Sequence, residues 1–180
     1  MNIRYNHSVS IFNLKIGREY YDWKLLFIKP RMTKTDIYYK VYVTNTFIYF
    51  IKIGGQFHNR YAYEKQLPDI LEHLFLFWFK KMEKKQGILE TDIDEKISSG
   101  DVDELIQRKH NFSLTTNTIE EILIKKQGTF HTGFHDNGTI SFTLKNGEKI
   151  KFIIPKATLL SSIKDNIRQF HQTLSIREGF

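Results

Sequence analysis

The chain has 180 residues, a net charge of +7, no cysteine, and 15 Phe, 9 Tyr and 2 Trp. The absence of cysteine excludes disulfide bonds and thiolate chemistry, and the aromatic content argues against an intrinsically disordered chain. The longest apolar run, Leu74–Phe79, is far shorter than the roughly 20 residues of a membrane-spanning helix, and the N-terminus lacks the apolar core of a signal peptide. We therefore expect a cytoplasmic protein with no transmembrane segment.

The charge is distributed unevenly along the chain. Residues 1–60 contain 10 Lys and Arg against 3 Asp and Glu, whereas residues 61–110 contain 8 against 11. A basic first third is typical of proteins that meet nucleic acid, an anionic membrane surface or an acidic partner. Because no compact block of Lys and Arg occurs, these cations are equally compatible with the solvated faces of strands.

Strands and one long helix are predicted for the first half of the chain. The strand segments are rich in β-branched and aromatic residues, and they cover residues 9–16, 21–28, 37–43 and 47–53. Asn45-Thr46 lies where a hairpin turn between the last two is expected. Apolar residues at helical spacing then predict a helix from Tyr63 to Lys85, which Gly87 is expected to end.

Residues 86–110 are polar and acidic, and they suggest a connector between two halves. Asp101 and Glu104 match a capping box and predict a short helix from Asp101 to Arg108. The expected organisation is an N-terminal β-sheet with a long helix over residues 1–86, an acidic helical connector over residues 87–110, and a β-meander with a C-terminal helix over residues 111–180.

The second half alternates apolar and polar residues in short segments. Strands are predicted at 112–114, 119–126, 140–144 and 150–154, with turns at Asn137-Gly138 and Asn146-Gly147. Apolar residues at spacings of three and four then predict an amphipathic helix over residues 157–173, with Thr158 or Ser161 as its N-cap.

The predicted fold class is α+β, with antiparallel β-sheets that are each followed by a packing helix. Ile37 and Ile140, which begin corresponding strands of the two halves, are 103 residues apart, as are Tyr49 and Phe152. This repeat is compatible with an old duplication, and equally with the common way to build such a unit. The sequence pattern is compatible both with one core shared by the two halves and with two separate cores.

Two stretches of the sequence are similar to a known domain family: the run GDVDELIQRKHNFSLTTNTIEEILIKK and the hairpin ISFTLKNGEKIKF that follows it. A short acidic helix, a strand, the pattern I-x-x-I-x-I-K-K, a hairpin and a terminal helix together resemble the bacterial pleckstrin-homology-like (PH-like) domains, over residues 100–175. That family has seven strands and a capping helix, so the resemblance implies that the N-terminal half contributes strands. It also implies a binding or scaffold module that is not an enzyme. The chain has no lipid-binding motif to which the family's ligand residues can be transferred.

Two places interleave aromatic and basic residues. On a strand over 37–43, Tyr38, Lys40 and Tyr42 share one face and form a candidate binding platform. The same alternation also describes an ordinary face with cross-strand aromatic packing. His58 and Arg60, beside Tyr61, are the second candidate ligand-binding pair.

Common catalytic motifs are absent from the sequence, including the Walker A loop, G-x-G-x-x-G, H-E-x-x-H and G-x-S-x-G. The nearest approach to a metal motif is His131, His135 and Asp136, which can converge only if the chain turns at Gly133. The same three residues are equally typical of a solvent-exposed turn that binds no metal. No catalytic residue and no cofactor are therefore assigned.

The primary hypothesis is a non-enzymatic binding or scaffold module that contacts a protein or an anionic membrane surface. The alternative is a nucleic-acid-binding protein that uses the basic, aromatic N-terminal sheet. A third hypothesis, an enzyme built around His131, His135 and Asp136, has the least support from the sequence.

Overall fold

The computed structural model describes residues 25–32, 34–54, 84–85, 87–97, 99 and 101–179. The predicted strand at 9–16, the first residues of the one at 21–28, most of the predicted long helix, His58 and Arg60 lie outside the described residues. The described strands are β1 (Leu25–Lys29), β2 (Ile37–Val43), β3 (Phe47–Gly54), β4 (Phe112–Thr115), β5 (Ile119–Lys125), β6 (Asp136–Leu144), β7 (Lys149–Pro155) and β8 (Ser175–Gly179). The helices are α3 (Val102–Gln107), α4 (Leu160–Phe170) and residues 87–97, which we call the cover helix.

The α+β class is confirmed, but the strands of both halves form one sheet instead of separate sheets. The strand order is β4-β3-β2-β1-β7-β6-β5-β8. Neighbouring strands are antiparallel except for β5 and β8, which are parallel. The two halves meet at two places: β1 pairs with β7 at Ile28 and Ile153, and β3 pairs with β4. The strands of both halves therefore contribute to one core.

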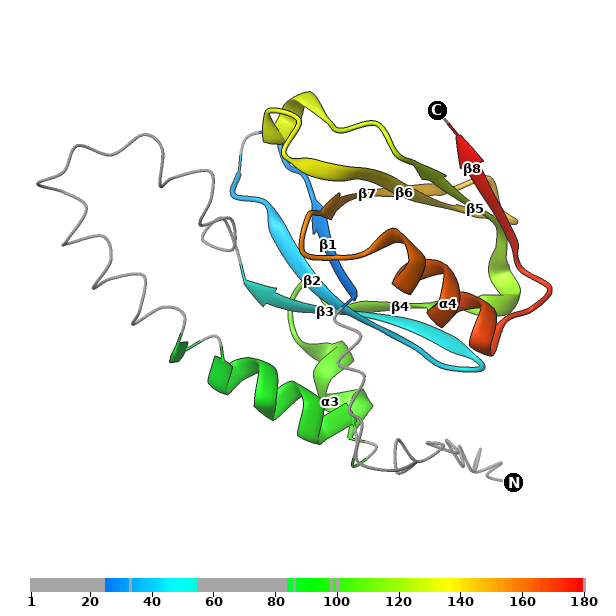
Figure 1. The fold of residues 1–180 in the computed structure, drawn as a ribbon. Helices are drawn as coiled ribbons and strands as arrows, with labels where there is room; N and C mark the ends of the chain where they lie inside the picture. The colour runs from blue at the N-terminus through cyan, green and yellow to red at the C-terminus, as the bar shows by residue number, and fades with distance from the viewer. Residues whose placement is uncertain are drawn as a thin grey trace, which may run out of the picture.

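The sheet is curled, because β4 and β5 are far apart in strand order but adjacent in sequence. They are joined only by the 3₁₀ turn η2 (Thr116–Thr118), and three residues span at most about 11 Å. The turn is fixed at both ends: Thr116 N donates to Thr46 O at 2.9 Å, and Lys145 N donates to Thr118 O at 2.9 Å. In Figure 1, α4 lies between the β3–β4 side and the β5–β6 side of this curled sheet.

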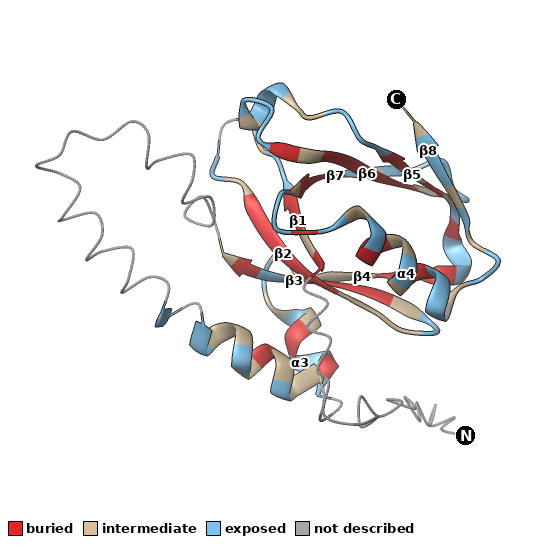
Figure 2. Ribbon diagram, in the orientation of Figure 1, coloured by how far each residue is buried: buried red, intermediate tan, exposed pale blue. Residues whose placement is uncertain are grey.

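The inner face of the sheet and α4 enclose the larger core. Its centre is aromatic, with Phe27, Tyr39, Phe50, Phe142 and Phe152 all nearly inaccessible to solvent. Ile163 and Ile167 bring the apolar stripe of α4 against this cluster, as the spacing predicts. Figure 2 shows the buried residues along the strands and on the inward side of α4.

The predicted N-cap of α4 is wrong, because Thr158 has another role. The cap residue is Leu159, and no side chain caps the helix. The buried Thr158 hydroxyl accepts a hydrogen bond from Leu26 N at 3.0 Å and donates one to Leu26 O at 3.1 Å. It thus ties the start of α4 to β1, a non-local contact that local sequence rules do not detect.

The acidic connector packs against the outer face of β1–β3. Gly87 is itself helical, and the residues after it are helical up to position 97. Ile93 of the cover helix and Leu105 of α3 are buried against Ile51 and Ile53 of β3. The predicted short helix is present as α3, but Asp101 makes no side-chain cap bond; Glu104 instead pairs with Lys96 at 2.6 Å.

The predicted turn at Asn137-Gly138 is also wrong. Both residues lie inside β6, where the register between β6 and β7 shifts between Asp136 and Thr139. Gly138 has a φ of 99°, which only glycine adopts readily, so the pair forms an irregularity within a strand. The turn at Asn146-Gly147 is confirmed between β6 and β7, with Gly147 at φ 84°.

The last strand, β8, was not predicted from the sequence. It adds to the outer edge of β5, and its side chains are mostly exposed. Ion pairs accompany the pairing: Arg177 lies 2.9 Å from Glu121, and Glu178 lies 2.5 Å from both Lys126 and Lys164. Hydrogen bonds from those two lysines lower the pKa of Glu178 to about 2.

Candidate functional site: a basic end with exposed apolar side chains

The predicted platform of Tyr38, Lys40 and Tyr42 does share one face of β2, but that face is covered. Tyr38 and Lys40 are buried, because β2 is packed on both sides: its other face joins the inner core and this face meets the cover helix. Lys40 Nζ lies 2.8 Å from both carboxylate oxygens of Asp94, and the Tyr42 hydroxyl donates to the same carboxylate. Tyr38 and Lys40 are therefore interior residues in this structure, whereas Tyr42 is partly exposed.

This ion pair gives a testable prediction about the cover helix. The Lys40 side chain is 6% exposed and Asp94 is 47% exposed, so Asp94→Ala leaves a buried ammonium without its partner. We expect Asp94→Ala to lower the free energy of unfolding by about 3 kcal/mol, measured by urea denaturation. Lys40→Met leaves the half-exposed carboxylate in contact with water and with the Tyr42 hydroxyl, and we expect it to cost about 1 kcal/mol or less.

The matched control for this prediction is the double variant Lys40→Met, Asp94→Ala. It contains no buried unpaired charge, so it should be more stable than Asp94→Ala alone. Equal losses for Asp94→Ala and the double variant would contradict a buried charge as the cause.

The three candidate metal ligands do not converge. His131 Nε2 lies 2.8 Å from Asp36 Oδ2, and His135 is exposed. Asp136 is buried and holds its own loop together. Within the described residues, no group of three or more His, Cys, Asp and Glu side chains is placed to hold a metal ion.

Asp136 organises the loop between β5 and β6. Its carboxylate accepts hydrogen bonds from Thr129 N at 2.9 Å, Thr129 Oγ1 at 2.6 Å, the Thr132 hydroxyl, and Gly138 N at 2.7 Å. Burial alone raises the pKa of Asp136, but these hydrogen bonds outweigh burial and lower the pKa below its usual value. The folded loop therefore stabilises the ionised form of the Asp136 carboxylate.

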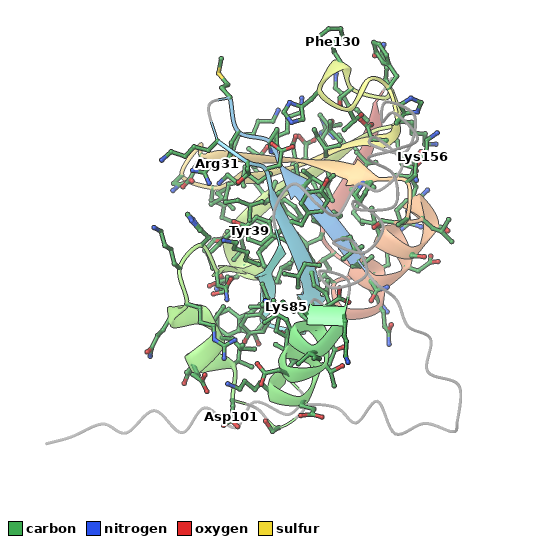
Figure 3. The ribbon with its side chains drawn as sticks, turned by 90° about the vertical axis from the view of Figure 1, so that its left-hand side faces the viewer. Arg31, Tyr39, Lys85, Asp101, Phe130 and Lys156 are labelled. Carbon is green, nitrogen blue, oxygen red and sulfur yellow. The ribbon has the colours of Figure 1, made fainter. Side chains whose placement is uncertain are left out.

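Asp36 joins this loop to the one between β1 and β2. One of its oxygens accepts a hydrogen bond from Arg31 N at 3.0 Å, and the other lies 2.8 Å from His131 Nε2. Two segments that are distant in sequence are thereby brought to the same end of the molecule: residues 30–32 with 34–36, and residues 126–135. Figure 3 shows Arg31 and Phe130 toward this end and Lys85 and Asp101 toward the opposite end.

A group of basic residues extends from this end along the edge of the sheet. We call it the basic band, and it consists of Arg31, Lys34, Lys52, Lys109 and His110. Desolvation lowers the pKa of His110 below its usual value, and the positive charges of Lys52, Lys109, Arg31 and Lys34 lower it further. Lys34, Lys52 and Lys109 are exposed. The band therefore combines accessible positive charge from three separate parts of the chain.

The backbone around the band is held by specific hydrogen bonds. The buried Tyr39 donates its hydroxyl proton to His110 O at 2.9 Å, and His110 adopts a φ of 76°. Asn111 accepts a hydrogen bond from Lys52 N at 2.8 Å and donates one to Leu105 O at 2.6 Å. These contacts fix the α3–β4 connection against β3, so Lys52 and Lys109 are held near each other.

Sequence reasoning did not find the basic band, because its members occur at positions 31, 34, 52, 109 and 110 with no local cluster. The N-terminal excess of basic residues was the only signal of it.

Among the described residues, no helix has the length and apolar content needed to cross a membrane. No protein-family model matches the chain, and no curated protein matches it significantly. The class that fold and site define is thus an α+β protein with a curled mixed sheet and a basic end.

Proposed function

We propose that this protein is a non-enzymatic binding module that contacts an anionic membrane surface through the basic band. The observation that carries the proposal is the pairing of β3 with β4 and the hydrogen bonds of Tyr39 and Asn111, which hold Lys52 beside the α3–β4 connection that contains Lys109. Arg31 and Lys34 of the β1–β2 loop add positive charge that also acts on His110. Juxtaposed Lys and Arg side chains attract anionic lipids, each contributing about 1 kcal/mol near the surface.

A PH-like unit is part of the same proposal. Seven strands, β1 to β7, are followed by the single helix α4, which packs on the inner face of the sheet. The N-terminal half supplies β1, β2 and β3, as the sequence resemblance requires. The additional strand β8 departs from that pattern. These features support the resemblance, which in turn favours a binding module over an enzyme.

The test is co-sedimentation with vesicles of phosphatidylcholine and phosphatidylserine, at low and high salt. We expect salt-sensitive binding, because exposed charges are screened within about 10 Å at 0.1 M ionic strength. Reversal of two band residues in Lys52→Glu, Lys109→Glu should weaken binding at least tenfold, or roughly 1.4 kcal/mol.

The matched control is Lys84→Glu, Lys85→Glu, which makes the same charge change at two exposed residues. Lys85 lies toward the opposite end of the molecule (Figure 3). Equal loss in both variants would show that only net charge matters and would contradict a localised site. A parallel titration with a single-stranded oligonucleotide tests the alternative: binding to it, without vesicle binding, would favour a nucleic-acid-binding function.

A further inference from the structure

The end from which the basic band extends also carries exposed apolar side chains. Five large hydrophobic residues are exposed in the described part of the chain, and three of them lie in the two loops that Asp36 joins. These three, which we call the apolar tip, are Met32 (103% exposed), Phe130 (87%) and Phe134 (60%). Large apolar side chains concentrated in this way mark an interaction site more often than isolated ones do.

The aromatic rings of the tip are held outward by the loop. The 3₁₀ turn η3 (Phe130–Thr132) is followed by Gly133 and Phe134, both with left-handed φ angles of 61° and 65°. A left-handed conformation is costly for a bulky residue, and Phe134 gains no burial from it. Phe134 N donates to Thr129 O at 2.8 Å, and Asp136 fixes Thr129 and Thr132. The two rings lie 6.2 Å apart, edge to face.

The neighbours of the tip identify the chemistry of its partner. Met32 directly follows Arg31 and lies two residues before Lys34, so one loop presents an apolar side chain between two cations. Apolar and aromatic side chains beside Lys and Arg match the lipid–water interface, where rings lie at headgroup depth and cations meet phosphates. A soluble anion would be recognised by the cations but would leave the rings in water.

We propose that Met32, Phe130 and Phe134 insert into the interfacial region of an anionic bilayer while the basic band contacts lipid phosphates. This inference rests on the proposed function and adds a mode of binding to it. The tip anchors the protein through burial of apolar surface, and the band supplies attraction and orientation. The membrane-facing end is then the end formed by the β1–β2 and β5–β6 loops, with the cover helix directed away from the bilayer.

The absence of cysteine allows a direct test, because one introduced thiol can be labelled specifically. Phe130→Cys is labelled with an environment-sensitive fluorophore, and Ile88→Cys, an exposed apolar site on the cover helix, is the matched control. Vesicles contain phosphatidylcholine, phosphatidylserine and, where depth is measured, spin-labelled lipid quencher. We expect a blue shift and quenching for the label at position 130 and neither for the label at position 88.

Binding measurements on Phe130→Ser, Phe134→Ser complement the labelling. Both side chains are exposed, so the fold should be retained, and vesicle affinity should fall by roughly tenfold for each ring removed. Vesicle binding with an unshifted, unquenched label at position 130 would overturn insertion while leaving the proposed function intact. Absence of vesicle binding by the full chain would overturn both. A shift at position 130 that grows with protein concentration without lipid would identify a second copy as the partner and overturn insertion.

Discussion

Replacement of Gly138 by alanine should lower the free energy of unfolding by about 3 kcal/mol or more, because two penalties combine at this position. The φ of 99° is unfavourable for any residue with a Cβ. An added Cβ would also lie 1.8 Å from Lys125 O, 2.8 Å from Lys125 C and 2.9 Å from Lys126 C. All three are backbone atoms at the end of β5 or of the residue that follows it. The clash can therefore be relieved only if β5 and β6 separate locally. Urea denaturation of the variant measures the loss.

Gly147→Ala is the matched control for this prediction. Gly147 also has a left-handed φ, 84°, but an added Cβ there meets nothing within 4 Å. Its cost should be that of the backbone conformation alone, about 1 kcal/mol. The difference between the two variants isolates the close approach of β6 to β5. Equal losses at both positions would mean that this approach is absent in solution.

Gly138 also shows what the sequence could not predict. Asn-Gly pairs favour left-handed backbone conformations, and the glycine of each pair has one: Gly138 has a φ of 99° and Gly147 a φ of 84°. Neither Asn137 nor Asn146 has a positive φ, so a type I′ turn forms at neither pair. Whether such a pair turns the chain or interrupts a strand depends on its neighbours. Asn137 donates to Thr158 O at 3.0 Å and Asp136 accepts from Gly138 N, so the pair continues within β6. Both contacts depend on the local and distant packing of the loop, which an Asn-Gly motif does not reveal.

Local patterns succeeded where one strand and its turn contain the information. The strand at Ile37–Val43 was predicted with the bounds that β2 has, and its alternation correctly separates Tyr39 and Val41 from Tyr38 and Lys40. The alternation could not show that a helix covers the second face. The acidic connector contributes that cover through Ile93 and Asp94, which are more than 50 residues away.

The same limit explains β8 and the basic band. β8 has one apolar residue, Ile176, in five, so no periodic pattern indicates a strand. Its pairing with β5 is accompanied by long-range ion pairs such as Arg177 with Glu121. The band likewise exists only after β3 and β4 pair and bring Lys52 near Lys109. Features made by non-local pairing were the ones that the sequence did not indicate.

The aromatic centre of the inner core gives the second large expected effect. Phe50 has no measurable solvent exposure, and its ring stacks on Phe112 at 4.6 Å and Phe152 at 5.0 Å, with Phe142 edge-on at 5.5 Å. These rings come from β4, β7 and β6, so Phe50 joins the β3–β4 side of the sheet to β6 and β7 across the interior. Phe50→Ala should lower the free energy of unfolding by about 3–5 kcal/mol, through lost burial and the cavity left behind.

Because native domains are stable by only about 5–15 kcal/mol, this loss should move the urea midpoint far down and leave a chain close to unfolding at physiological temperature. Phe130→Ala is the control, since it removes the same atoms from a ring that is 87% exposed, and it should change stability by less than about 0.5 kcal/mol. A small effect of Phe50→Ala would mean that the β3–β4 and β5–β7 sides of the sheet do not close on a common core. That result would argue against the curled sheet on which the basic band and the apolar tip both depend.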